Sequence, residues 1–451
     1  MARLVIVSNR TPSPREHGPA AGGLAVAVAD AMVPGSLWFG WSGRRGPTTE
    51  PEIAEADGVT YATINLEEAE YRLFYVGFAN GALWPLLHFR LGLVDFRRED
   101  FRAYYAVNQR FATALAPLLR PDDLVWIHDY HLFPLGAELR RLGVANRIGF
   151  FLHTPFVPPA VFAALPGAET LIRDLCACDV VGFHTEGYRN DFLECARHML
   201  GVVPDADGRF AFEDHEVKAI VAPVGIDANR FTADAVRAAR RAEAKRLRES
   251  MGDRALAIGV DRLDYSKGLP QRFIAFGRLL ADFPEHRRHV SFLQVAARSR
   301  EDVGDYQRLR RELDRMAGDT NGRYSEFDWT PLRYMTRTLT RTTLAGFFRI
   351  ARLGIVTPLR DGMNLVAKEY VAAQNPSDPG VLILSRFAGA ADELKQALIV
   401  NPFDPDEIAE AMHAGLVMDL SERRDRHQAL LACVRQGTAE HFCEIFLAAL
   451  R

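Results

Sequence analysis

Short apolar runs recur along the chain, each followed by a polar or glycine-rich turn and then by a segment with helical periodicity. Runs that are short and rich in β-branched or aromatic residues are typical of strands buried on both faces of a parallel sheet. The expected strands cover residues 4–7, 124–127, 148–152, 180–183, 219–221, 255–260, 290–295, 353–356 and 381–384. Helical periodicity is clearest at 104–119 and 269–282. Strands that alternate with helices predict an α/β protein with doubly wound parallel sheets.

A boundary between two halves of similar size is expected at residues 223–226, where a strand ends. A charged helical stretch at 233–250 then leads into a fresh strand at Ala255. The pattern therefore predicts two Rossmann-like domains, over 1–225 and 226–436, with a cleft between them. The last segment, 437–451, has a helical apolar pattern and can return to the first domain.

The composition is that of a globular protein. Of 451 residues, 48% are hydrophobic and 25% are charged, which argues against disorder. Lys and Arg number 55 against 58 Asp and Glu, a net charge of −3. This balance gives no reason to expect a nucleic acid or a membrane surface as a partner.

The cysteines and the N-terminus indicate a cytoplasmic protein. The five cysteines are odd in number and form no regular framework, so reduced thiols are expected. The spacing of Cys176 and Cys178 does not fit a zinc site, and we expect no metal. The apolar run at 4–7 is too short for a signal peptide, and no run approaches the ~20 apolar residues that span a bilayer.

Ligands of open α/β sheets bind beyond the carboxyl ends of the strands, where this sequence places polar residues. Arg10 follows the first strand, and Gly22 and Gly23 precede an apolar helix. Glycines there let backbone amides approach a phosphate or a sugar, although a loop without ligand explains them equally well. The G-x-G-x-x-G fingerprint of dinucleotide-binding proteins is absent.

Asp129 and His153 follow two further strands of the first half. A single histidine at a strand end is more often structural than functional. An acid and an imidazole at two strand ends of one sheet, however, can converge on a polyol, whose hydroxyls both groups can bind.

In the second half, Arg262 and Lys267 lie five residues apart across a turn that follows the strand at 255–260. A guanidinium and an ammonium can together hold a diphosphate and stabilise its charge as it leaves. A surface network of Asp, Arg and Lys is an equally good explanation of the spacing alone. Arg298 and Arg300 follow the next strand and add positive charge at the same edge.

Residues 356–369 read as a strand, a tight turn and a helix start. Backbone amides at 362–366 would be free to cradle a phosphate. Glu369, one turn into the helix, can take both hydroxyls of a ribose, and Asp361 lies at the turn. The pattern favours a nucleotide-sugar site over a capped helix start with a solvated acid.

Taken together, these segments resemble the retaining glycosyltransferases of the trehalose-6-phosphate synthase family. The resemblance runs essentially end to end and is carried by the strings at 7–10, 21–24, 38–43, 83–85, 126–131, 262–268 and 358–370. It implies two Rossmann-like domains facing across a cleft (GT-B), a C-terminal helix crossing back to the first domain, and no metal or cofactor. The implied reaction transfers glucose from a nucleoside diphosphate glucose, typically UDP-glucose, to C1 of glucose 6-phosphate and gives α,α-trehalose 6-phosphate.

The resemblance also implies a role for individual residues. Arg262, Lys267, His153 and Asp361 are the expected catalytic residues, the last two holding the transferred glucose. The remaining donor-binding residues are expected to be Gly22, Gly23, Leu339, Leu365, Val366, Ala367, Lys368 and Glu369. The acceptor phosphate is assigned to Arg10, Tyr75 and Arg300, and the acceptor sugar to Asp129 and Trp84.

Trp84 and Thr154 are assigned to selection of the acceptor anomer. Thr154 stands where the family commonly has an aliphatic residue, and Leu339, in the expected base pocket, stands where an aromatic is common. The expected partners are UDP-glucose or another nucleoside diphosphate glucose, glucose 6-phosphate, and further copies of the chain in a dimer or a tetramer.

Three other functions are weighed against this one. The same chemistry with glycerol 3-phosphate as acceptor would give glucosylglycerol phosphate. A catalytically silent sugar-phosphate sensor is disfavoured by the intact set of donor residues. A pyridoxal-phosphate phosphorylase of related architecture is disfavoured because no lysine lies in a recognisable cofactor setting.

Overall fold

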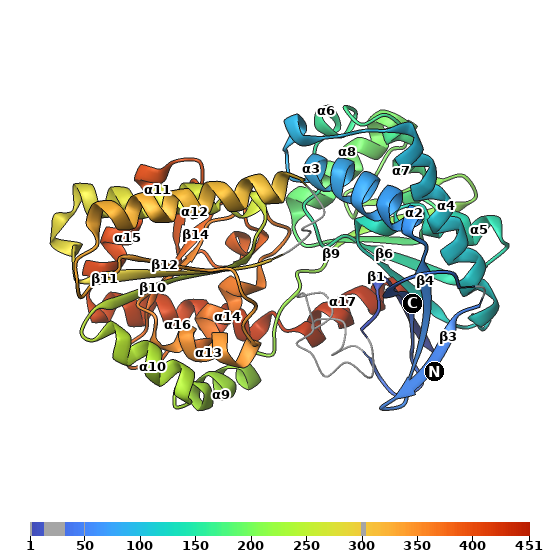
Figure 1. Ribbon diagram of the computed structural model, residues 1–451. Coiled ribbons are helices and arrows are strands. Elements are labelled where there is room, and N and C mark those ends of the chain that lie inside the picture. Colours follow the sequence, from blue (N-terminus) through green and yellow to red (C-terminus); the bar gives the residue numbers. More distant parts are fainter. Residues whose placement is uncertain (1, 13–31, 49, 299–303) are drawn as a thin grey trace. The chain divides into compact units, whose positions relative to one another are not determined.

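The computed structural model describes residues 2–12, 32–48, 50–298 and 304–451 (Figure 1). The chain forms two compact units. Unit 1 comprises Met1–Val224 and Ala439–Arg451, and unit 2 comprises Gly225–Thr438. The chain therefore enters unit 2 once and returns to unit 1 with its last helix.

Unit 1 is built on a nine-stranded sheet with the order β3-β4-β2-β1-β5-β6-β7-β9-β8. Its strands are β1 (Leu4–Arg10), β2 (Leu37–Arg45), β3 (Glu52–Ala56), β4 (Val59–Leu66), β5 (Leu124–His128), β6 (Arg147–Phe151), β7 (Val180–Phe183), β8 (Arg209–Phe212) and β9 (His215–Val221). The inner strands pair in parallel, as expected.

At both edges of unit 1, antiparallel hairpins that were not predicted extend the parallel core of the sheet. Strand β3 pairs antiparallel with β4, and β8 pairs antiparallel with β9. Each pair is a hairpin with a two-residue connection, which only antiparallel strands can use. In the first, Asp57 and Gly58 have φ of 52° and 77°, the left-handed pair that a tight hairpin requires.

The helices of unit 1 lie mostly on one side of its sheet, and α17 lies on the other (Figure 1). They are α2 (Glu68–Glu70), α3 (Trp84–Leu87), α4 (Arg98–Leu115), α5 (Leu135–Arg141), α6 (Pro159–Phe162), α7 (Ala168–Leu175), α8 (Glu186–Leu200) and α17 (Ala439–Leu450), together with the π-helix η1 (Tyr71–Leu83). The expected helix at 104–119 is α4, which begins earlier and ends at Leu115.

Helix α17 is held on unit 1 by aromatic stacking. The ring of Phe446 lies parallel to that of Trp126, with centroids 4.5 Å apart and planes at 9°. Gly149 of β6 and Gly182 of β7 make room for it, because a Cβ atom would lie 2.6 Å and 2.8 Å, respectively, from carbons of the Phe446 ring.

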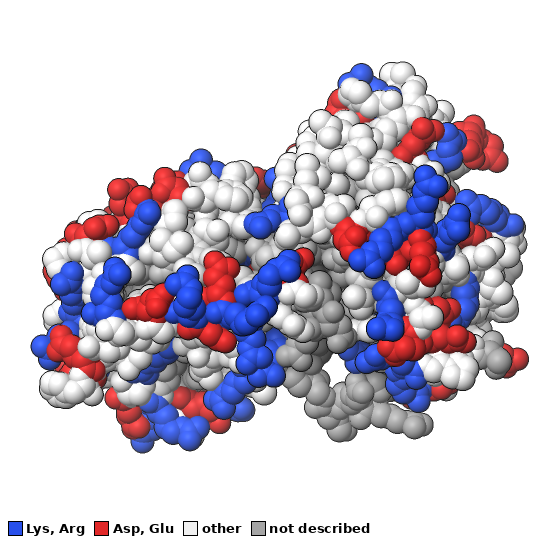
Figure 2. Space-filling view, turned by 45° about the horizontal axis from the view of Figure 1, so that its top comes forward, with Lys and Arg blue, Asp and Glu red and all other residues white. Residues whose placement is uncertain are grey.

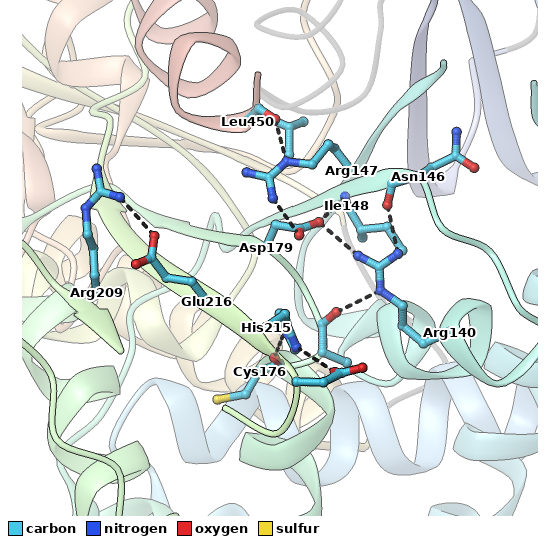
Figure 3. A network of polar contacts seen from close by, with 12 residues as sticks. Arg140, Asn146, Arg147, Ile148, Cys176, Asp179, Arg209, His215, Glu216 and Leu450 are labelled. Atoms are coloured by element: carbon cyan, nitrogen blue, oxygen red, sulfur yellow. Dashed lines mark hydrogen bonds and ion pairs between the residues drawn. The ribbon is translucent and has the colours of Figure 1, made fainter. Parts of the chain in front are cut away.

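A polar network fixes the end of α17 (Figure 3). Arg147 donates from Nε to the carbonyl oxygen of Leu450 over 3.2 Å and from Nη1 to Asp179 over 2.7 Å. Asp179 also accepts from Arg140 and from the amide of Ile148. The prediction that the last helix returns to the first half is confirmed.

Unit 2 is built on a six-stranded, wholly parallel sheet with the order β12-β11-β10-β13-β14-β15. Its strands are β10 (Ala255–Arg262), β11 (Val290–Ala297), β12 (Leu332–Met335), β13 (Leu353–Val356), β14 (Val381–Ser385) and β15 (Leu398–Val400). Helices cover both faces, with α11, α12 and α15 on one side (Figure 1). The helices are α9 (Ala228–Ala238), α10 (Ala242–Met251), α11 (Leu269–Asp282), α12 (Gly304–Tyr324), α13 (Arg341–Ile350), α14 (Leu365–Ala373), α15 (Pro405–Val417) and α16 (Leu420–Gln436).

Every apolar run that was expected to be a strand is one, and the helix expected at 269–282 is α11. The charged stretch at 233–250, expected to be one helix, is instead the end of α9 followed by α10. The turn between them lets both helices pack against α13, whose Gly346 lies against the end of α9 at Ala238.

The surface and the thiols agree with the composition. Basic and acidic side chains are interspersed over the face drawn in Figure 2. All five cysteines are free, and Cys433 alone is exposed. None of the described helices combines the length and the apolar character needed to cross a bilayer.

Candidate active site

The turn that follows β10 is built from buried polar contacts. Asp264, fully buried, accepts from the amide of Ser266 over 3.0 Å and from the hydroxyl of Tyr306 over 3.1 Å. Gly268 has a φ of 66°, and a Cβ there would lie 2.2 Å from the carbonyl oxygen of Thr357. Only glycine allows this approach, which brings Lys267 beside the end of the neighbouring strand β13.

Lys267 and Asp361, predicted from separate motifs, meet at this edge. The Lys267 Nζ donates to Asp361 Oδ2 over 2.6 Å, and Asn364 Nδ2 donates to the same oxygen over 2.9 Å. The two ion-pair side chains are only 10% and 16% exposed. A nearly buried ammonium is thus held in place at the edge of the sheet where ligands of this fold class bind.

Arg272 of α11, which was not predicted as a site residue, supports this turn from the interior of unit 2. It is fully buried and donates to Asp261 over 2.6 Å and to the carbonyl oxygen of Lys267 over 3.2 Å. Its other acceptors are Gln294 and Thr357. Burial raises the pKa of Asp261, and Arg272 opposes that shift. A guanidinium that reaches three strands fixes their ends relative to one another.

Two exposed arginines lie at the same edge of the sheet as Lys267. Arg262 ends β10, and Arg298 follows β11, whose Ala297 is the register partner of Arg262. The carboxyl edge of these two strands therefore carries two guanidiniums and one ammonium. Arg300, expected at this edge and in the acceptor site, lies outside the described residues.

The start of α14 presents backbone donors. Asn364, with φ of 78°, caps the helix and accepts from the amide of Ala367 over 3.4 Å. The amides of Leu365 and Val366 have no acceptor within the helix itself. Lys368 directs its buried ammonium to Glu393 at 2.6 Å, so its side chain is committed inside the unit and only its backbone could serve a ligand.

Glu369 is half-buried and paired with Arg341 of α13, whose Nε donates to it over 2.8 Å. Burial raises the pKa of Glu369, and Arg341 opposes the rise. Arg341 also lies over the ring of Phe231 at 4.9 Å. Leu339 is half-buried in the loop just before α13. Arg341 was not predicted, because its partner lies 28 residues further along the chain.

In unit 1, Arg10 lies at the end of β1 against Gly43. A Cβ at Gly43, where φ is 84°, would lie 2.7 Å from the Arg10 Nε. The glycine therefore allows the guanidinium to lie flat on the backbone of β2. Gly22 and Gly23, expected next to this strand end, lie outside the described residues.

Tyr75 and Trp84 belong to one aromatic cluster. Tyr75, on η1, stacks on His131 with ring centroids 5.6 Å apart and planes at 8°. Trp84 is 5% exposed, and its ring lies 5.5 Å from that of Tyr130. Tyr130 and His131 follow Asp129 directly, so the cluster joins three residues predicted for the acceptor.

Asp129 and His153 are brought together, as predicted for two strand ends. Asp129 has a φ of 76°, a strained conformation for a residue other than glycine, and accepts from the amide of His153 over 3.4 Å. His153 Nε2 is hydrogen-bonded to Nδ1 of the buried His128 at 3.0 Å. Burial lowers the pKa of His153 well below its usual value, with His184 adding to the effect.

Thr154 is buried, and among the described residues its hydroxyl has no hydrogen-bond partner. A buried hydroxyl without a partner costs folding free energy, so the position is not explained by folding alone.

Each of the two α/β units has polar side chains at the carboxyl ends of its central strands, and one unit bears basic groups suited to a diphosphate. These features are typical of a nucleotide-sugar-dependent glycosyltransferase of the two-Rossmann-domain class. The sequence model of glycosyltransferase family 20 matches residues 5–451. The chain belongs to this family.

Individual relatives agree along the whole length. Trehalose-6-phosphate synthase from Sodalis glossinidius (strain morsitans) is 46% identical over 453 residues, which cover all of this chain and 96% of the relative. The crystal structure of a UDP-forming α,α-trehalose-phosphate synthase from Burkholderia vietnamiensis matches with a TM-score of 0.97 at 45% identity, over all of this chain and 97% of that one. A Burkholderia xenovorans synthase in complex with glucose 6-phosphate matches with a TM-score of 0.95 at 44% identity, over the whole of both chains.

Proposed function

We propose that this enzyme transfers glucose from UDP-glucose to C1 of glucose 6-phosphate, with retention at the donor carbon, and releases α,α-trehalose 6-phosphate and UDP. The observation that carries the proposal is the basic edge of unit 2, where Arg262 ends β10 and Lys267, fixed by Asp361, follows it. Relatives that match this chain from end to end carry the names of that activity.

The donor is held by unit 2. Arg262 and Lys267 bind its diphosphate, and the amides of Leu365 and Val366 bind a phosphate oxygen at the start of α14. Glu369, paired with Arg341, accepts from the ribose hydroxyls, and Leu339 lies against the base. Asp361, fixed by two donors, accepts from hydroxyls of the glucose.

The transfer proceeds on one face of the sugar. As the bond from the anomeric carbon to the diphosphate breaks, the leaving oxygen takes the proton of the incoming hydroxyl, and the new glycosidic bond forms on the same side. Arg262 and Lys267 stabilise the charge that develops on the diphosphate. No enzyme nucleophile is needed.

His153 serves the reaction as a neutral group. Since burial and His184 lower its pKa, its ring is uncharged at pH 7. A neutral imidazole held by His128 can exchange a hydrogen bond with a sugar hydroxyl without bringing a positive charge near the donor carbon.

The acceptor is held by unit 1. Arg10 and Tyr75 bind its phosphate, with Arg300 as a further candidate, while Asp129 and Trp84 bind its sugar ring. Trp84 and Thr154 select the anomer. Gly22 and Gly23 approach the donor diphosphate in this proposal.

The proposal is tested by a coupled assay of nucleoside diphosphate release with UDP-, GDP- and ADP-glucose, each against glucose 6-phosphate and glycerol 3-phosphate. Turnover with UDP-glucose and glucose 6-phosphate is expected. Faster turnover with glycerol 3-phosphate would show that the acceptor is glycerol 3-phosphate and not glucose 6-phosphate. Binding of glucose 6-phosphate without turnover of any donor would favour a catalytically silent sugar-phosphate sensor.

We also propose that the protein acts in the cytoplasm as a dimer or a tetramer of this chain. Light scattering coupled to size-exclusion chromatography tests the assembly, because a monomeric mass would contradict it. The free cysteines agree with a reducing compartment.

A further inference from the structure

A second cluster of chemically active side chains lies at the other end of the unit 2 sheet. His286 belongs to the short helix η6 (Pro284–His286), which precedes β11, and His413 belongs to α15. Since the strands of this sheet are parallel, η6 lies at their amino ends, whereas Lys267 and Asp361 follow their carboxyl ends. The cluster is therefore separate from the proposed donor site.

Three potential metal ligands converge in this cluster. His286 Nε2 and His413 Nδ1 are 2.9 Å apart, and Oε1 of Glu285 lies 3.7 Å from the same His413 nitrogen. One ligand atom from each of the three residues lies within 4.8 Å of the other two. Neither ring makes another hydrogen bond to the part of the chain that the structure describes.

The side chains of this cluster are held in position by packing. His286 is buried, and the His413 ring is stacked on that of Phe283 at 4.1 Å with planes at 13°. Phe283 and His286 flank Glu285 on the segment that ends α11, and α15 packs along α11. The packing of these elements thus holds the two imidazoles close together, with ring centroids 5.1 Å apart and planes at 60°, before any ion binds.

Neighbouring positive charges are turned away from the cluster. Arg287 donates to the carbonyl oxygen of Leu280 and lies over the ring of Tyr324. Arg288 pairs with Glu326 and Asp328. In the described part of the chain, Glu285 has no ion-pair partner except His413, so its carboxylate is not already neutralised by an arginine or a lysine.

We propose that Glu285, His286 and His413 form a binding site for a divalent transition-metal ion, of which Zn²⁺ is the best fit. Two imidazoles and one carboxylate are a common zinc donor set, with water as the fourth ligand. Tetrahedral coordination needs the two nitrogens about 3.3 Å apart, so the rings must separate by only a few tenths of an ångström. The ion ties α11 to α15 and stabilises unit 2 without touching the reacting groups.

The test uses the full chain carrying Cys433→Ser, which removes the exposed thiol as a competing ligand, after dialysis against a chelator. Zn²⁺ is titrated calorimetrically, and Co²⁺ is followed by its visible absorption. One ion per chain is expected to bind. His413→Ala is expected to weaken binding by at least about tenfold, because even indirect partners of metal ligands contribute that much. Glu285→Gln, at an exposed position, is expected to weaken it in the same direction without disturbing the fold.

The matched control is His198→Ala on α8, which removes an exposed histidine that also faces a glutamate, Glu194 at 3.5 Å, but belongs to no candidate metal cluster among the described residues. Its affinity for Zn²⁺ should equal that of the parent. The proposal is overturned if no saturable binding occurs, if His413→Ala and Glu285→Gln both bind as tightly as the parent, or if His198→Ala alone loses the ion.

Discussion

At the scale of single residues, Lys267 combines two roles that normally conflict. It is nearly buried, and its ammonium is paired with Asp361, which is in turn held by Asn364. A lysine held in this way loses little conformational entropy when it meets a phosphate, because its position is set before the ligand binds.

Lys267→Ala is expected to lower kcat by about 100-fold to 1,000-fold, the usual effect of removing one group that stabilises developing charge. Stability should fall by only about 1–3 kcal/mol, since Asn364 still donates to Asp361. Steady-state kinetics and thermal unfolding measure the two effects. Lys245→Ala, which removes an exposed lysine paired with Glu249, is the control and should change neither. Near-normal turnover of Lys267→Ala would refute the role of this lysine.

Two buried histidines near Asp129, His128 and His153, predict that the stability of the protein depends on pH. Burial lowers the pKa values of His128 and His153 well below the usual value of the side chain. Below about pH 6.5 these histidines are therefore protonated in the unfolded chain but not in the folded chain. The free energy of unfolding then falls as the pH falls, by up to about 1.4 kcal/mol per pH unit for each histidine.

His128→Asn keeps a polar group near His153 and removes one of these two ionisations. The difference in unfolding midpoint between pH 7.5 and pH 5.5, measured calorimetrically, should shrink. His198→Asn, at an exposed position, should leave that difference unchanged. An undiminished difference in His128→Asn would contradict the assignment.

At the scale of elements, the link between β10 and α11 depends on one backbone conformation. Gly268 has a positive φ and lies against the carbonyl oxygen of Thr357. Gly277, in the middle of α11, has nothing within 4 Å of where its Cβ would be. The same substitution at these two positions therefore has opposite consequences.

Gly268→Ala is expected to displace the turn that carries Lys267, to lower the unfolding midpoint and to raise KM for the donor. Gly277→Ala should leave kinetics unchanged and stabilise α11 by about 0.5–1 kcal/mol. Thermal unfolding and donor titrations check both variants. Equal effects of the two alanines would show that the turn geometry does not matter.

The central elements were predictable because their signals are local. Buried parallel strands such as β5 and β7 are continuous apolar runs, and α11 has a clean helical period. Six of the described strands were not predicted: the edge strands β3, β8, β12 and β15, and β2 and β4 next to them. Strands β3 and β8 alternate or carry charge, and a short exposed strand resembles a loop. The turn between α9 and α10 has no glycine or proline to mark it.

Within the candidate site, residues at strand ends were found because the topology of parallel sheets places them. Arg272 and Arg341 were not found, because each acts through partners that are distant in sequence or in a different element. The same holds for His128, whose significance depends on contact with His153 across two strands. The roles of these residues follow from their packing in the folded protein and are not marked by any sequence motif.

At the scale of the whole molecule, the last helix connects distant parts of the sequence. Phe446 fills the space above Gly149 and Gly182, two residues that have no side chain to fill a cavity left there. A truncation at this position should therefore be costly, since the cost of a cavity depends on how far its walls can collapse.

Phe446→Ala is expected to destabilise unit 1 by about 3–5 kcal/mol, the usual range for a buried phenylalanine. Amide hydrogen exchange should rise in β6 and β7 and stay unchanged in β13 and β14 of unit 2. Phe403→Ala, at a side chain that is 58% exposed, should leave all four strands protected. Unchanged exchange in β6 and β7 would show that α17 contributes little to unit 1.

The return of α17 to unit 1 sets an order of events during synthesis. Residues 225–438 all leave the ribosome before α17 does. Unit 2 can therefore reach its final form while unit 1 still waits for the helix that covers Trp126. The half of the protein that is translated first is the half that finishes folding last, and in the interval its apolar sheet face is a natural target for chaperones.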